Sequence, residues 1–176
     1  MNKLALLPIA ALLTADLPVR AADGCDAVKA AAIKVLQVPS HLYMTETAGS
    51  NGSKTRNAET IYLNDVTYVM VNNRWRKSHI SPKELAEMKK ESDQKGVCSA
   101  VRDEAVSGEP ATLYKAHSQT PNDTVDTQIW ISKLRGLPLK QINDIDVGGV
   151  RGKSHTEIRY EYTNVAAPAV AEPQHK

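Results

Sequence analysis

The stretch QIWISKLRGLPLK, residues 128–140, decides how the C-terminal half of this chain folds. Residues 129–131 are Ile, Trp and Ile, and β-branched and aromatic side chains favour a strand. Residues 134–136 form a turn, because the glycine that ends them adopts backbone angles that other residues avoid. Pro138 lacks an amide hydrogen and therefore favours the first position of a strand. The stretch predicts two strands joined by a tight turn.

Alternating apolar residues and turn signals predict further strands on both sides of this stretch. A helix is expected within residues 23–39, and a second helix is expected to begin at Ser81, where Glu84 completes a capping box. The expected strands or hairpins are residues 41–48, 58–63, 66–71, 74–80, 97–119, 125–132, 137–147 and 154–165, with a loop at residues 49–57. Short connections predict antiparallel neighbours, so the fold class is α+β: one long antiparallel sheet with two helices.

The N-terminus has the pattern of a secretory signal peptide. A single lysine precedes an almost wholly apolar run at residues 4–13, and small side chains follow up to Ala21. We expect residues 1–21 to be removed, residues 22–165 to form one domain and residues 166–176 to be a disordered tail. The alternatives are a core helix, which Pro8 disfavours, and a lipoprotein anchored at Cys25, which residues 22–24 match poorly.

The chain contains two cysteines, Cys25 and Cys98. In an exported chain an even number of cysteines without Cys-x-x-Cys spacing most simply predicts a disulfide. We therefore expect a Cys25–Cys98 disulfide rather than a reactive or metal-binding pair.

Other chemistry is not supported by the sequence. The formal net charge is +2 without a concentrated basic stripe, which argues against a nucleic-acid partner. No nucleophile elbow or glycine-rich phosphate loop is present, and no histidines have the close spacing of a zinc site. We expect no enzyme activity, no metal and no cofactor. The basic segment RWRK, residues 74–77, has two interpretations: an amphipathic strand with Trp75 in the core, which we favour, or a contact to membrane headgroups or an anionic ligand.

Four segments together resemble the LolA-like class of periplasmic outer-membrane lipoprotein carriers and sorting proteins. They are ETIYLNDVTYVMVNNRWRKS, VSGEPATLYKAHS, TQIWISKLRGLPLK and EIRYEYTNV, at residues 59–78, 106–118, 127–140 and 157–165. The resemblance covers roughly residues 40–166. It implies a strongly curved antiparallel sheet, an incomplete β-barrel, with helices covering its concave side. It also implies that the hollow binds an acyl chain or the lipid part of a lipoprotein.

The resemblance leads to a predicted ligand site of six apolar residues on the concave side: Leu42, Met44, Ile129, Ile131, Leu137 and Leu139. It implies a non-catalytic periplasmic protein whose partners are lipid or lipoprotein acyl chains and, transiently, a membrane or outer-membrane partner. The chain has no Phe and only 5% aromatic residues. The alternative is therefore an interaction or sensor module with a closed core. Oligomeric state is not predicted.

Overall fold

The computed structural model describes residues 24–48, 54–91, 96–148 and 152–170. Nine antiparallel strands form one open sheet in the order β4-β3-β2-β1-β9-β8-β7-β6-β5. The helices are α1 (Gly24–Lys34), the short 3-10 helix η1 (Val35–Gln37) and α2 (Pro82–Glu91). The strands are β1 (Ser40–Ala48), β2 (Lys54–Leu63), β3 (Val66–Val71), β4 (Arg74–Lys77), β5 (Val97–Val106), β6 (Glu109–Gln119), β7 (Asp123–Ser132), β8 (Pro138–Val147) and β9 (Gly152–Glu161).

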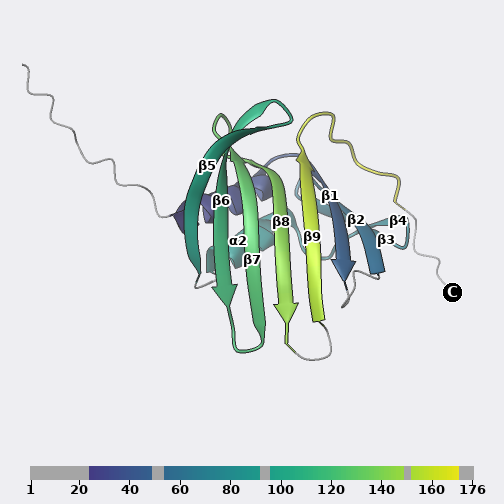
Figure 1. The fold of residues 1–176 in the computed structure, drawn as a ribbon. Coiled ribbons are helices and arrows are strands. Elements are labelled where there is room, and N and C mark those ends of the chain that lie inside the picture. Colours follow the sequence, from purple (N-terminus) through teal and green to yellow (C-terminus); the bar gives the residue numbers. More distant parts are fainter. Residues whose placement is uncertain (1–23, 49–53, 92–95, 149–151, 171–176) are drawn as a thin grey trace, which may run out of the picture.

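The sheet curves and does not close, and both helices lie on one side of it (Figure 1). This is the predicted α+β half-barrel, with four strands before α2 and five after it. The predicted signal peptide, residues 1–21, lies outside the described residues, as do residues 171–176 of the predicted tail.

The turn between β7 and β8 has the predicted form. Gly136 has a positive φ of 62°, and its amide donates to the carbonyl of Ser132 at 2.8 Å. The Ser132 amide in turn donates to the carbonyl of Leu137 at 2.9 Å. Pro138 is the first residue of β8, so its missing amide hydrogen costs no hydrogen bond inside the sheet.

The β2–β3 and β3–β4 connections are two-residue turns, as predicted. Asn64 and Asp65 have φ values of 50° and 58°, and Asn72 and Asn73 have values of 51° and 59°. Positive φ at both central residues matches the twist of the flanking strands, and Asn and Asp tolerate it.

The strand limits differ from the prediction most at β2, at β4 and at β9, which ends at Glu161 instead of residue 165. Residues 54–57, predicted as loop, extend β2 and pair with β1. They are exposed and polar, so they lack the apolar alternation that identifies a buried strand. β4 ends at Lys77 instead of residue 80. Within the predicted tail, Val170 forms a parallel bridge with Trp75 at the edge of the sheet.

The helices pack on the sheet through small and apolar side chains. Ala31 of α1 is 1% exposed and packs with Ile129 and Ile131 of β7. Val35 and Leu36 of η1 form a second buried cluster with one residue of α2, Ala86. The alanines of α1 let the helix approach the sheet closely.

Candidate functional site

The helix-facing side of the sheet is defined by strand register. Directly opposed residues on antiparallel strands share a face of the sheet. Ile129 lies against α1, so the residues opposed to it across the neighbouring strands face the same side. The resulting row is Tyr114, Ile129, Gln141, Ile158, Met44 and Ala58, on β6, β7, β8, β9, β1 and β2.

Four of the six predicted ligand residues face this side. Ile129 and Ile131 are 2% and 7% exposed because α1 covers them. Leu42 is half-buried against the cluster formed by η1 and α2. Met44 is half-buried next to Ile158 of β9.

The other two predicted residues lie elsewhere. Leu137 is buried, but it precedes β8 and belongs to the turn. Leu139 packs in a separate cluster with Leu113 and Trp130. The register of β7 and β8 shifts between Trp130 and Ile131, so simple alternation does not apply at Leu139. The structure therefore does not bring these six residues together on one continuous wall.

A chain of polar side chains crosses the helix-facing side. The Tyr160 hydroxyl donates to Gln141 Oε1 at 2.9 Å, and Gln141 Nε2 donates to Asn143 Oδ1 at 2.8 Å. The Thr127 hydroxyl also donates to Asn143 Oδ1, at 3.0 Å. We call these four residues the polar chain. Sequence analysis missed it; the only signal was the alternation of Gln141 and Asn143 along one strand.

Three tyrosines pack against the apolar cluster of η1 and α2, and one of them, Tyr160, belongs to the polar chain. Burial is the main cause that raises the pKa of Tyr160, and it also raises the pKa values of Tyr62 and Tyr162. Tyr160 and Tyr62 pack against the η1–α2 cluster, as does Tyr162. These hydroxyls therefore stay protonated at neutral pH and act as neutral hydrogen-bonding groups.

Part of the outer side of the sheet carries a row of charged side chains. His117 Nδ1 lies 2.7 Å from Asp126 Oδ1, and His155 Nδ1 lies 2.7 Å from Asp144 Oδ1. Asp126 and Asp144 are directly opposed, so the four residues form one row across β6 to β9. Part of this row lines an open hollow of about 410 Å³. Such a charged surface does not suit an acyl chain.

Two absences hold for the residues that the structure describes. In those segments, no group of three or more His, Cys, Asp or Glu side chains is arranged to hold a metal ion. The described helices are all too short or too polar to cross a membrane.

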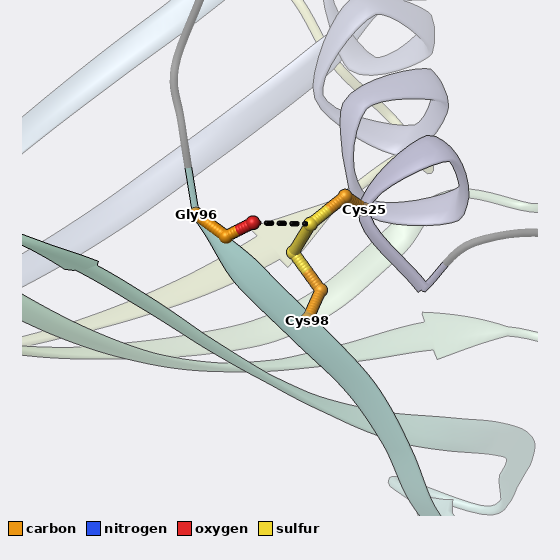
Figure 2. Close-up of a disulfide and its surroundings, with 3 residues drawn as sticks. All are labelled: Cys25, Gly96 and Cys98. Atoms are coloured by element: carbon orange, nitrogen blue, oxygen red, sulfur yellow. Dashed lines mark hydrogen bonds between the residues drawn. A yellow bond between two sulfur atoms is a disulfide. The ribbon is translucent and has the colours of Figure 1, made fainter.

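The predicted disulfide is present. Cys25 at the start of α1 is bonded to Cys98 of β5, with the two Cα atoms 5.0 Å apart (Figure 2). Cys25 Sγ also lies 3.5 Å from the carbonyl oxygen of Gly96. A disulfide sulfur carries no proton, so this is a contact and not a donated hydrogen bond. The bond holds the N-terminal end of α1 against the edge strand.

No protein-family model and no curated protein matches the chain. Similar solved structures include MucB in complex with MucA(peri), with a TM-score of 0.47 and 14% identity over 84% of this chain. This chain spans 57% of the length of that one. LprF from Mycobacterium bovis has a TM-score of 0.42 and 8% identity, over 84% of this chain and 98% of its own. A LolA superfamily protein from Nitrosomonas europaea has a TM-score of 0.32 and 10% identity, over 80% of this chain and 92% of its own. A protein of the LolA-like class, which the sequence resembles, is thus among the solved structures similar to this chain.

Proposed function

We propose that this chain is a periplasmic, non-catalytic lipid- or lipoprotein-binding protein. In this proposal an acyl chain lies on the helix-facing side of the half-barrel. The observation that carries it is the pair Met44 and Ile158, which are apolar, adjacent and half-buried. Unlike Ile129, neither belongs to a buried cluster among the described residues. Apolar surface that water still reaches can gain free energy by covering an acyl chain.

The surroundings of this pair suit a ligand that is mostly apolar. Ligand sites are typically apolar walls with a few placed polar groups. Met44 and Ile158 supply the wall, and the polar chain runs beside them through Gln141. The site would lie beyond the part of the sheet where Ala31 closes over Ile129 and Ile131.

The periplasmic location rests on two features. The Cys25–Cys98 disulfide is typical of oxidising compartments. The predicted signal peptide directs export, although residues 1–21 lie outside the described part of the chain.

A second candidate function is an interaction module with a closed core. The packing of Ala31 on Ile129 and Ile131 favours it, because all three side chains are almost fully buried. In that case the helix-facing side would serve stability alone, and partners would bind elsewhere.

A fluorescent fatty-acid titration with parallel circular dichroism separates the two functions. Met44→Asp places a charge on the proposed wall, so the protein should fold and lose the probe. Ile131→Asp places the charge in the closed core and should unfold the protein. Thr45→Asp is the matched control, since Thr45 is exposed on the opposite face of β1 and should keep the probe. Wild-type protein that takes up no probe would overturn lipid binding and leave the interaction module.

A further inference from the structure

The polar chain has a direction. The Tyr160 hydroxyl donates to Gln141 Oε1. Gln141 presents its amino group to Asn143 and donates to Asn143 Oδ1. Reversing one of the two amides alone would place two donors or two acceptors against each other. The orientation of each amide is therefore coupled to that of the other.

This direction determines what Asn143 can offer. Its Oδ1 accepts two hydrogen bonds, from Gln141 and from Thr127. A carbonyl oxygen has two lone pairs, so its accepting capacity is used. The Nδ2 group retains two N–H donors, and no partner for them occurs in the described part of the chain. In the described part of the chain, Thr67 Oγ1 is the only fully buried side-chain nitrogen or oxygen atom that lacks a hydrogen-bond partner. Asn143 Nδ2 also lacks a partner but is not in that class, so it is accessible to solvent.

The position of this donor is next to the proposed acyl wall. Gln141 is directly opposed to Ile158, which is opposed to Met44. Asn143 is two residues further along β8 and faces the same side. A ligand that laid its chain on Met44 and Ile158 would bring its polar end to Asn143.

We infer that Asn143 Nδ2 binds the head of the ligand by donating to an acceptor oxygen, an ester or amide carbonyl or a carboxylate. This inference rests on the proposed function. Successive hydrogen bonds polarise one another, so the bonds from Tyr160 and Gln141 strengthen the donor that the ligand meets. The site would thus prefer acyl compounds with an acceptor head over apolar compounds without one.

The test compares Asn143→Asp with wild type by displacement of N-phenyl-1-naphthylamine, an apolar fluorophore without an acceptor head. The substitution keeps the acceptor for Gln141 and Thr127 but removes both free donors. The competitors are methyl dodecanoate and dodecanoate. We expect the variant to bind methyl dodecanoate about tenfold more weakly and the fluorophore unchanged. The matched control is Asn57→Asp, because Asn57 accepts from Thr45 in the same way on the outer side, and it should behave as wild type.

The outcomes distinguish the inference from the function on which it rests. Wild-type protein that does not bind the fluorophore overturns both. Fluorophore binding with equal methyl dodecanoate affinity in wild type and variant overturns the head-group inference alone. A variant that binds dodecanoate more weakly but methyl dodecanoate equally well also overturns the head-group inference. Repulsion between the new aspartate and the carboxylate of dodecanoate would explain that result. The competitor that wild type prefers identifies the head as ester or carboxylate.

A measurement on the wild-type protein guards against a variant that fails to fold. The side-chain amide signals of Asn143 in a nitrogen-15 spectrum should shift on titration with methyl dodecanoate, and those of Asn57 should not. Stationary Asn143 signals while the fluorophore is displaced would overturn the inference.

Discussion

The guanidinium of Arg135, in the β7–β8 turn, is bonded through two nitrogens to the carboxylate of Glu109 at the start of β6. Arg135 also lies over the ring of Tyr162, 4.9 Å from its centre. The turn predicted from LRG is therefore tied both to the neighbouring hairpin and to the segment after β9. The side chain of Arg135, and not only the glycine, therefore fixes the position of the turn.

Glu109 should make stability depend on pH. The hydrogen bond from Arg135 is the largest cause that lowers the pKa of Glu109, and the Ser132 hydroxyl adds to it. A carboxyl whose pKa is lower in the folded state stabilises the protein at neutral pH and loses that effect as pH falls through the folded-state pKa. Glu109→Gln should lower the free energy of unfolding at pH 7 by about 1 kcal/mol, because the pair is partly exposed.

The measurement is urea unfolding of wild type and Glu109→Gln from neutral to acidic pH. The two curves should begin to converge as the pH falls below about 4.3, the ordinary pKa of a glutamate, and should meet below the lowered pKa of Glu109 in the folded protein. A difference that stays constant across this range would mean that charge is not the cause.

The disulfide should be a major source of stability. Cys25 and Cys98 are 73 residues apart in sequence, so the bond closes a long loop in the unfolded chain. Replacing both cysteines by serine should lower the free energy of unfolding by roughly 4 kcal/mol in the chain-entropy view. The measurement is the denaturation midpoint of the double serine variant and of the wild type with its disulfide reduced. The two midpoints should agree. Free thiols in unreduced, denatured wild type would contradict the bond.

The start of α2 has the capping box that the sequence predicts. The Glu84 amide donates to Ser81 Oγ at 3.2 Å, and the Ser81 amide donates to Glu84 Oε2 at 2.7 Å. Ser81→Ala should destabilise α2 by about 1 kcal/mol. Hydrogen exchange of the α2 amides should accelerate, while that of the exposed control Ser99→Ala should match wild type. Unchanged exchange in Ser81→Ala would show that the cap contributes little.

Thr67 offers a stabilising substitution. It is 4% exposed, and its hydroxyl has no hydrogen-bond partner among the residues that the structure describes. A buried polar group without a partner is costly, and valine has nearly the same shape. Thr67→Val should therefore raise the free energy of unfolding by about 1 kcal/mol. The thermal midpoint reports the sign, and a decrease would mean that the hydroxyl is hydrogen-bonded in solution, for example to water.

Local chemistry made much of the fold predictable. Asn72 and Asn73 determine their own turn, and Ser81 with Glu84 determines a helix start. Residues 54–57 were missed because exposed polar residues form a strand only when β1 supplies partners. The face of Leu139 was missed for a related reason, since a register shift depends on two strands together. The packing of Ala31 on Ile129 could not be predicted from neighbouring residues either, because it depends on where a helix distant in sequence lies.

The place where β1 meets β9 has a consequence for how the protein is made. In every other pair of neighbouring strands in this sheet, the two strands are consecutive in the chain. By contrast, β1 and β9 come from opposite ends of the domain. During synthesis the first strands emerge long before their last partner exists. Until β9 arrives, β1 and β8 are open edges that can pair with other chains. Contacts so distant in sequence also form slowly. Chains cut short before residue 152 should therefore aggregate rather than fold as a smaller sheet.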